Sequence, residues 1–365
     1  MVTVTDTARS NVEGFASLEG KKECYLYSKP EEKTKSVRCA TCSRRCVISD
    51  GKTGFCLVRK NIGGKLHALN YSKLCTVGID PIGKKPLAHF HPDADVLSIA
   101  TMGCNFRCKY CCNWMISQPD KMEGDEIPPE QVIRLAKEGG ADGVSYTYTE
   151  PTIFFEICYD TGKLAKEAGL FNTWVTNGYF TKETLDMGAP YIDAMTVDFK
   201  ASGNERFYKD YVSINDVEPI YENLKNLKKK GIYFEITDLI VPRVGDNLEE
   251  TVELAKWIRK NLGKETVLHL LRFYPAYKMM DFPDTPVETL EKAQKMCRDH
   301  LDYVLLGNVP GHPAESTYCP KCNDVVIRRF GFQIIGWNMD KDNKCSNCGN
   351  KIPIIGGLKR PLPPE

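Results

Sequence analysis

Three cysteines in the segment 103–111 follow the spacing C-x3-C-x2-C. Thiolates hold iron–sulfur clusters, and a cubane [4Fe–4S] cluster is normally bound by four of them. A loop that offers only Cys104, Cys108 and Cys111 therefore leaves one iron open to a small molecule. The apolar run over 95–101 directly before the loop predicts a buried strand. The loop is thus expected at the C-terminal end of a strand, where α/β enzymes place their active sites.

Two C-x2-C pairs near the C-terminus are made by Cys319, Cys322, Cys345 and Cys348. Four thiolates in two such pairs favour tetrahedral Zn²⁺, or a mononuclear iron, in a closed structural site. The small residues Asn323 and Gly349 follow the pairs and strengthen this signal. We expect this site to stabilise a small module or to present a surface to a partner.

A third group lies near the N-terminus and consists of Cys39, Cys42, Cys46 and Cys56. This spacing is compatible with a structural zinc ion and equally with a second [4Fe–4S] cluster, which would carry electrons or have a tuned redox potential. The sequence does not distinguish the two. Four unliganded cysteines within so short a segment are the least favoured interpretation.

The total of 16 cysteines in 365 residues also bears on the compartment. Clustered cysteines in a reducing compartment favour metal binding over disulfides. Outside the clusters, Cys158 and Cys297 fall on helical patterns and are interpreted as buried small hydrophobic residues. Cys112 adjoins the loop, but adjacent side chains rarely point to the same ligand, so it has little weight as a fourth cluster ligand.

The charge balance excludes some functions. The 49 basic and 48 acidic residues give a net charge of +1, which offers no footprint for nucleic acid. The first ten residues lack the charged and apolar regions of a secretory signal. No apolar stretch approaches the roughly 18 residues that a membrane helix needs. We therefore expect a cytoplasmic protein.

Seven candidate strands alternate with amphipathic helices; they are 95–101, 142–149, 171–176, 193–199, 232–240, 266–273 and 302–306. Such β-α repeats build a parallel sheet with helices outside it, here a closed or partial barrel. A helix is predicted over 247–262. The last helix is expected to begin with a capping box, in which Thr285 is the N-cap, Pro286 is N1 and Glu288 is N3.

The predicted organisation has five parts along the chain. They are a flexible lead-in (1–36), a Cys-rich metal-binding segment (37–92), the barrel (93–314), a zinc-ribbon-like module (315–353) and a flexible tail (354–365).

The cysteine loop with Tyr110 as its aromatic residue resembles the motif of the radical S-adenosylmethionine (SAM) superfamily. The similarity covers about 39–349 and is most specific for the radical SAM enzymes of the AmmeMemoRadiSam system, relatives of pyruvate formate-lyase activating enzyme. Its further motifs are Asn113-Trp114, Thr149-Glu150-Pro151, Thr176-Asn177-Gly178, Asp198-Phe199-Lys200 and Gly307-Asn308-Val309. The resemblance implies a partial (β/α)6 barrel, a [4Fe–4S] cluster and SAM as cofactors.

The resemblance also implies roles at the strand ends. Thr149 and Glu150 stand where activating enzymes have Gly-Gly-Glu-Pro, a segment that supplies backbone groups to the methionyl amine of SAM. The alternative is strand-end packing capped by a proline. Asn177 is a candidate polar contact to SAM. Strand alternation places Asp198 and Lys200 on one side as an ion pair. Lys200 would bind the SAM carboxylate or a substrate anion, or the pair would seal the barrel.

Three later residues complete the expected site. Arg272 is a candidate for the SAM carboxylate or the substrate. Tyr274 stands where relatives often carry histidine, and either hydrogen-bonds in its place or only packs. Asn308 follows the last strand and is expected near the adenosine.

The implied reaction is a one-electron cleavage of SAM to methionine and a 5′-deoxyadenosyl radical, which takes a hydrogen atom from an unidentified substrate. The expected partners are a one-electron reductant such as ferredoxin or flavodoxin, and a protein substrate or neighbouring-gene proteins. One alternative is an activase that draws hydrogen from a glycine of a partner enzyme. The other is a non-enzymatic iron–sulfur/zinc protein for electron transfer or scaffolding, which an open iron in a barrel disfavours.

Overall fold

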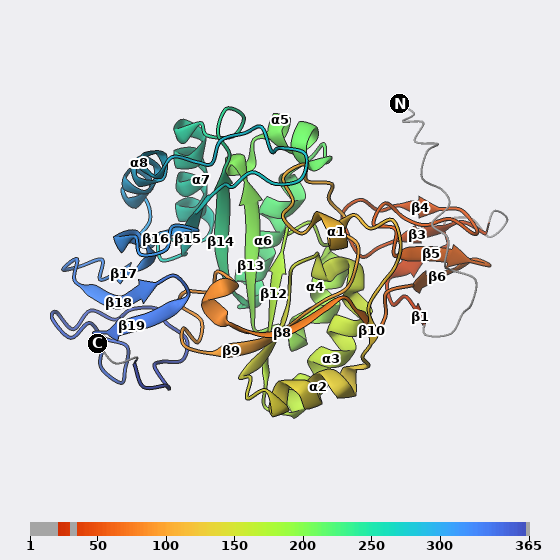
Figure 1. Ribbon diagram of the computed structural model, residues 1–365, viewed down its shortest axis with the longest axis horizontal. Coiled ribbons are helices and arrows are strands. Elements are labelled where there is room, and N and C mark those ends of the chain that lie inside the picture. Colours follow the sequence, from red (N-terminus) through yellow and green to blue (C-terminus); the bar gives the residue numbers. More distant parts are fainter. Residues whose placement is uncertain (1–20, 30–34, 363–365) are drawn as a thin grey trace.

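An eight-stranded sheet forms the centre of the computed structural model, which describes residues 21–29 and 35–362 (Figure 1). In spatial order the strands are β16 (Val304–Gly307), β15 (Leu268–Arg272), β14 (Tyr233–Ile240), β13 (Ala194–Lys200), β12 (Phe171–Thr176), β11 (Gly143–Tyr146), β9 (Asp95–Ala100) and β8 (Thr76–Pro81). All pair in parallel except β8, which runs antiparallel to β9. All seven predicted strands are present, with ends that differ by at most three residues.

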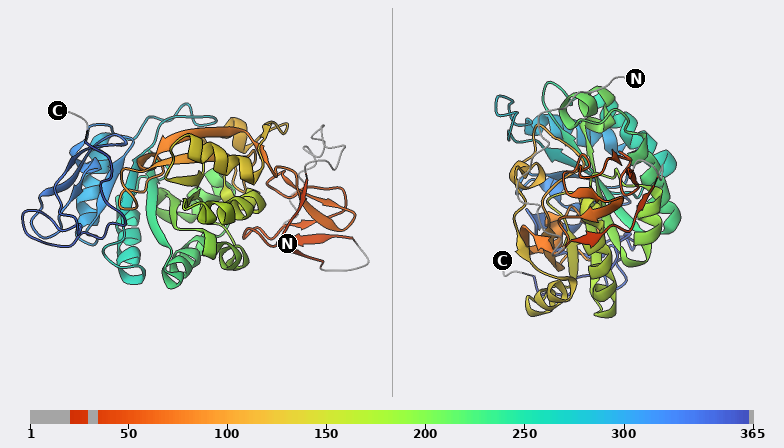
Figure 2. Two further views of the ribbon diagram at one scale, coloured as in Figure 1. Left: turned by 90° about the horizontal axis from the view of Figure 1, so that it is seen from below. Right: turned by 90° about the vertical axis from the view of Figure 1, so that its right-hand side faces the viewer.

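The helices follow the strands in β-α order and lie along one side of the sheet (Figure 2). They are α2 (Pro129–Glu138), α3 (Phe155–Glu167), α4 (Lys182–Gly188), α6 (Glu218–Lys230), α7 (Leu248–Asn261) and α8 (Val287–Arg298), with two short helices, α1 (Trp114–Ser117) and α5 (Glu205–Phe207). Within the described residues the end strands β8 and β16 do not pair with each other. The sheet is therefore an open, partial barrel whose seven parallel strands match the seven predicted from the sequence, one more than the six that the resemblance implied.

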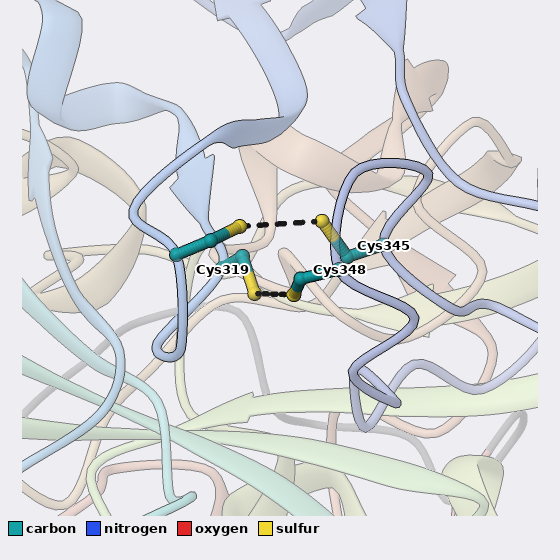
Figure 3. Close-up of side chains that lie close together, drawn as sticks. Cys319, Cys345 and Cys348 are labelled. Carbon is teal, nitrogen blue, oxygen red and sulfur yellow. Dashed lines mark hydrogen bonds between the residues drawn. The ribbon is translucent and has the colours of Figure 1, made fainter.

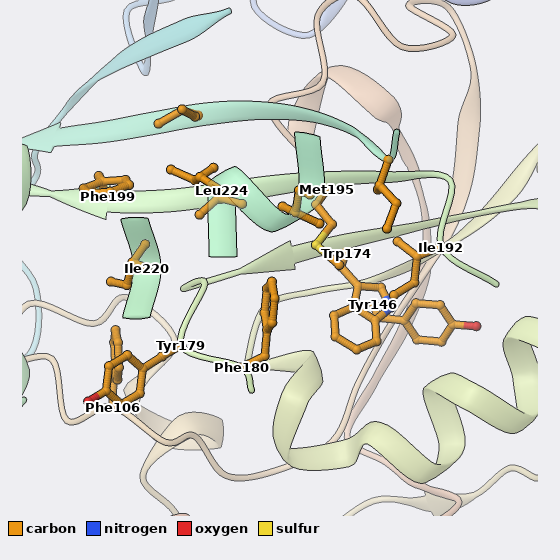
Figure 4. Close-up of a cluster of buried hydrophobic side chains, with 14 of the residues drawn as sticks. Phe106, Tyr146, Trp174, Tyr179, Phe180, Ile192, Met195, Phe199, Ile220 and Leu224 are labelled. Carbon is orange, nitrogen blue, oxygen red and sulfur yellow. The ribbon is translucent and has the colours of Figure 1, made fainter. Parts of the chain in front are cut away.

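Strand alternation divides the core between the two faces of the sheet. On β9, Leu97 and Ile99 are buried with Val132 and Ile133 of α2. A large aromatic and aliphatic cluster continues this layer around Trp174 (Figure 4). This packing fixes the register of the strands, because a slip by one residue would turn the apolar side chains to the opposite face.

Residues 82–91 cover the other face of the sheet, where Ile82, Leu87 and Phe90 pack with Val96 and Ala194. The fully buried carboxylate of Glu235 accepts hydrogen bonds from the backbone N–H groups of Ala88 at 2.9 Å and His89 at 2.7 Å. His269 Nε2 lies 2.6 Å from the same carboxylate. A buried carboxylate is stable only when donors replace its lost water. This segment therefore closes the barrel interior near the start of β14.

The segments flanking the barrel are more closely attached than the sequence suggested. Of the predicted lead-in, residues 1–20 and 30–34 lie outside the described residues, but β1 (Lys22–Glu23) pairs with β6 (Lys65–Ala68). The boundary at residue 92 does not coincide with the edge of the sheet, since β8 belongs to it. Residues 354–362, predicted to be flexible, lie against the barrel because Arg360 pairs with Asp95 and Asp142. Residues 363–365 lie outside the described residues.

The smaller strands build two outer layers. The N-terminal ones also include β2 (Tyr27–Ser28), β3 (Val37–Cys39), β4 (Val47–Ile48) and β5 (Arg59–Ile62), while β7 (Lys73–Leu74) pairs with β10 (Asp125–Glu126). The C-terminal module is a three-stranded antiparallel sheet of β17 (Thr317–Tyr318), β18 (Val325–Phe330) and β19 (Gln333–Trp337). None of the helices within the described residues is long and apolar enough to cross a bilayer.

The predicted capping box of α8 is wrong. The helix begins at Val287, and its N-cap is Pro286, which makes no side-chain cap. Thr285 instead donates its hydroxyl to the carbonyl of Ile240 at 2.6 Å and accepts the N–H of Phe273 at 2.9 Å. The Thr285 hydroxyl therefore hydrogen-bonds to the ends of β14 and β15 and does not cap the helix.

The burial of His89 predicts that the free energy of unfolding decreases in mild acid. Burial lowers its pKa from 6.5 to about 3; Glu235 opposes the shift, while Arg329 and His269 reinforce it. Between about pH 6.5 and 3 the unfolded chain binds a proton that the folded chain excludes, so the free energy of unfolding falls as the pH falls. Urea denaturation at pH 7 and pH 5 measures this.

The matched variant is His89→Gln, whose amide can still reach Thr317, the partner of His89 Nε2 at 3.0 Å. We expect it to be less stable at pH 7 but to lose less stability between pH 7 and pH 5 than the unmodified protein. An equal loss in both proteins would assign the acid sensitivity to other groups.

Candidate active site

The three-cysteine loop follows β9, as predicted, and loops from other strands brace it. The N–H groups of Arg107 and Lys109 donate to the carbonyls of Val212 and Tyr211 at 3.0 and 2.9 Å. The N–H of Lys278, in the loop after β15, donates to the Lys109 carbonyl at 2.8 Å. The cysteine loop is thus fixed to the segments that follow β13 and β15 by backbone hydrogen bonds, which depend little on side-chain identity.

The three thiols of the loop do not form the compact set that one metal ion needs. Among the described residues, the set of at least three ligand atoms that all lie within 4.8 Å of one another is at the C-terminus and does not include Cys104, Cys108 and Cys111. At least two of the three loop sulfurs are therefore more than 4.8 Å apart. In a cubane cluster each thiolate binds a different iron, so the three thiolates need not converge on one point.

Lys200 and Asp198 form the predicted ion pair at the end of β13, with 3.0 Å between Nζ and Oδ2. Asp198 is held by the Thr237 hydroxyl at 2.6 Å. Burial alone would lower the pKa of Lys200, but Asp198 and the thiols of Cys108 and Cys112 raise it above its usual range. A charged ammonium thus lies beside the cysteine loop, where it can bind an anion.

Glu150, buried at the end of β11, is hydrogen-bonded on both carboxylate oxygens. Oε1 accepts from the Thr176 hydroxyl at 2.7 Å and the Thr152 N–H at 3.1 Å, and Oε2 accepts from the Asn177 N–H at 2.8 Å. Burial nevertheless raises the pKa of Glu150. Its side chain therefore connects the ends of β11 and β12, while Thr149 donates its hydroxyl to the Thr101 carbonyl at 2.8 Å.

Asn177 extends this connection to the cysteine loop. Its Nδ2 donates at 2.7 Å to Oδ1 of Asn105, the residue after Cys104. This contact orients the loop, and the expected contact of Asn177 to SAM stays a prediction. Sequence reasoning did not find Asn105, whose role depends on a partner 72 positions away.

Tyr148 shows how the chain differs from the glycine-containing segment of activating enzymes. Its φ is +63°, in the left-handed region that glycine adopts more easily. Its hydroxyl donates to Asp80 of β8, and Asp80 also pairs with Lys85 at 2.8 Å. Burial lowers the pKa of Lys85 to about 8. These contacts to β8 stabilise the unusual backbone, and the sequence offered no sign of them.

Arg272, Tyr274 and Asn308 come together at the ends of β15 and β16. Arg272 donates to the Thr285 carbonyl at 2.8 Å and the Tyr274 hydroxyl at 3.2 Å, and it pairs with Asp284. The Tyr274 hydroxyl donates to the Asn308 carbonyl at 2.9 Å. The arginine is therefore engaged in a local network, whereas Lys200 lies nearer to the cysteine loop.

Tyr110, the aromatic residue of the motif, is buried beneath the loop. Its ring packs against Phe207 and Phe273, with centroids 5.6 and 6.4 Å away, and its hydroxyl lies beside the Cys108 thiol. At the outer side of the loop, Trp114 stacks on Tyr277 at 4.9 Å. The contacts with Phe273 and Tyr277 connect this region to the segment after β15, and the contact with Phe207 connects it to α5.

The C-terminal cysteines converge on one point (Figure 3). Cys319 and Cys348 have their sulfurs 3.5 Å apart, and Cys322 and Cys345 3.6 Å apart. Tetrahedral Zn²⁺ with Zn–S bonds of about 2.3 Å requires sulfurs about 3.8 Å apart.

Both knuckles of this site share one backbone geometry. Asn323 and Gly349, which follow the second cysteine of each pair, have φ of +63° and +69°, and their N–H groups donate to the carbonyls of Cys319 and Cys345 at 2.8 Å. Both residues thus close a tight turn around their cysteine pair, and a preformed four-thiolate site results.

Comparisons with known proteins show what the chain is similar to. The sequence model of the radical SAM superfamily matches residues 98–258. An uncharacterized protein of Methanocaldococcus jannaschii is 46% identical over 338 residues, 92% of this chain and 99% of that protein. A protein of the same organism named "Putative glycyl-radical enzyme activating enzyme" is 28% identical over 167 residues, 45% of this chain and 63% of that protein.

Among solved structures, a radical SAM methyltransferase from Sphaerobacter thermophilus has 17% identity and a TM-score of 0.48, covering 60% of this chain and 67% of that one. The chain belongs to the radical SAM superfamily. It is an enzyme of the radical-generating kind and is related in sequence to activating enzymes.

The C-terminal site predicts a linked loss of metal and stability. We expect Cys345→Ser to lose about one metal ion per chain and to lower the melting temperature by several degrees, because binding to a preformed site stabilises the folded state. Metal analysis and thermal unfolding measure both. Cys75→Ser, at a half-buried thiol outside the three clusters, should keep the ion. Equal metal content in both variants would exclude Cys345 as a ligand.

Proposed function

We propose that this enzyme cleaves SAM reductively at a [4Fe–4S] cluster held by Cys104, Cys108 and Cys111 and abstracts a hydrogen atom from a substrate. When bound, the cluster supplies the electron for cleavage, and the resulting 5′-deoxyadenosyl radical is the hydrogen acceptor. The observation that carries this proposal is a loop of three cysteines, with no fourth ligand in its motif, at the carboxyl edge of a parallel sheet with a buried ammonium beside it. The C-terminal site is proposed to hold zinc.

The protein's own residues bind, orient and shield the reactants. Lys200 is positioned to bind the carboxylate of SAM, since its ammonium lies beside Cys108 and Asp198 fixes its direction. The backbone of Thr149 and Glu150 is a candidate acceptor for the methionyl amine, and the Glu150 side chain holds that backbone in place. Tyr110 with Phe273 excludes water from beneath the loop.

Two substrate classes remain in consideration. The similarity to a protein named as a glycyl-radical enzyme activating enzyme favours a glycine of a partner protein. The additional cysteine-rich segments favour direct modification of another substrate, because a minimal activase does not need them. The reductant is proposed to be a ferredoxin or flavodoxin.

The substrate class can be measured by deuterium transfer. The reduced enzyme is incubated with SAM and a perdeuterated cell extract divided into macromolecules and small molecules, and 5′-deoxyadenosine is analysed by mass spectrometry. Deuterium from the macromolecular fraction, with a glycyl radical signal in electron paramagnetic resonance, would identify an activase. Deuterium from the small-molecule fraction would identify a metabolic enzyme.

The loop cysteines provide the direct test of SAM cleavage. We expect Cys104→Ala, Cys108→Ala and Cys111→Ala each to abolish 5′-deoxyadenosine formation with dithionite while circular dichroism stays unchanged, because the open iron is lost. Cys112→Ala, the adjacent exposed thiol, should retain it. Retained cleavage in any of the three loop variants would contradict the assignment.

Lys200 provides a test of SAM binding. We expect Lys200→Met to weaken SAM binding roughly tenfold to a hundredfold, the range for one charge-assisted hydrogen bond. Equilibrium dialysis with the reconstituted enzyme measures the affinity. Lys278→Met is the matched control, since this exposed lysine contacts the cysteine loop through its backbone only. Equal affinity in both variants would leave Lys200 the role of sealing the barrel mouth.

A further inference from the structure

The four N-terminal cysteines surround one enclosed space. Cys39, Cys42, Cys46 and Cys56 all line a single cavity. Three of them are buried, and Cys46 is half-buried. Strand β3 contributes Cys39, the turns before β4 and β5 contribute the others, and the barrel closes the space with Asn105 and Ile153. Cysteines of separate turns therefore border one small space that is largely shielded from water.

The spread of these thiols bears on the two metals that the sequence left open. The sulfurs of the C-terminal set all lie within 4.8 Å of one another, whereas among the described residues no three of Cys39, Cys42, Cys46 and Cys56 form such a set. A zinc ion needs sulfurs about 3.8 Å apart. A cubane cluster binds each thiolate at a different iron and keeps the thiolates farther apart. The N-terminal sulfurs are thus spread more widely than those of the C-terminal site, which favours a cluster over a single ion.

Two buried donors lining the cavity have no partner among the described residues. They are Nε of Arg59 and Nδ2 of Asn105, on side chains that are 2% and 0% exposed. The other guanidinium nitrogens of Arg59 are bound by Glu156 at 3.0 and 2.7 Å. A buried donor without an acceptor costs about 1–3 kcal/mol. The sulfides and thiolates of an anionic cluster are the acceptors that this cavity otherwise lacks.

The same residues connect the cavity to the active site. Asn105 follows the cluster ligand Cys104, and its Oδ1 is held by Asn177. Arg44, which also lines the cavity, donates to the carbonyls of Asn105 and Ser213. One guanidinium of the cavity wall therefore contacts the segment that carries Cys104.

We propose that Cys39, Cys42, Cys46 and Cys56 hold a second [4Fe–4S] cluster, with Arg59 and Asn105 donating to its sulfur atoms. All four irons have a protein ligand, so this cluster exchanges single electrons and does not bind SAM. It accepts one electron from a reductant of the ferredoxin class and passes it to the cluster at Cys104. The metal assignment is independent of the proposed SAM chemistry.

The test removes the active-site ligands and keeps the N-terminal site intact. In the triple variant Cys104→Ala, Cys108→Ala, Cys111→Ala, anaerobic reconstitution should leave about four irons and four sulfides per chain, with one zinc ion. Reduction should give the electron paramagnetic resonance signal of a [4Fe–4S]⁺ cluster. SAM should leave that signal unchanged. An iron-free triple variant with two zinc ions would overturn the proposal, and so would a signal that SAM perturbs.

Adding Cys39→Ser and Cys42→Ser to the triple variant should remove the remaining iron and keep one zinc ion. Adding Cys297→Ala, at a buried thiol of α8 that does not line the cavity, should keep about four irons. Iron retained after loss of Cys39 and Cys42 would contradict the ligand assignment. Formation of 5′-deoxyadenosine by the unmodified enzyme is measured separately, so the two proposals can fail independently.

Discussion

The buried carboxylate of Glu150 organises the carboxyl edge of the sheet. It accepts hydrogen bonds from Thr152, Thr176 and Asn177, and Asn177 in turn holds Asn105 in the cysteine loop. A charge in this position is expensive without donors, and a neutral carboxyl could not accept all of these bonds equally well. The ends of β11 and β12 and the cysteine loop are therefore constrained together, and the position of Cys104 depends on a residue outside that loop.

The two ends of the barrel strands have different roles: the starts close the interior, and the carboxyl ends hold the cysteine loop. Near the strand starts, Glu235 binds the backbone of Ala88 and His89, and the segment 82–91 closes the interior. At the carboxyl ends, backbone hydrogen bonds from the loops after β13 and β15 fix the cysteine loop. Parallel strands direct their C-terminal loops to one edge, so a rigid closed end supports an end where chemistry can vary.

The three groups of cysteines are held in place by different parts of the fold. The C-terminal knuckles are two identical turns whose backbone hydrogen bonds preform a narrow site. The loop after β9 is wide and depends on neighbouring loops for its shape. The N-terminal group uses the barrel wall as one side of its cavity. The proposed N-terminal cluster would thus be joined to the active site by shared residues, while the C-terminal site lies in a separate module.

The sequence by itself determined the order of strands and helices, the three cysteine groups and the Asp198–Lys200 pair, because each rests on local spacing. It could not determine how far apart the sulfurs of each group lie, since turns and distant strands set those separations. Thr285 does not cap α8 as predicted, because its hydroxyl hydrogen-bonds to the ends of β14 and β15. Arg272 is engaged by Asp284, and Arg44 reaches Asn105. Only the tertiary structure decides such contacts, because they join residues that no local pattern relates.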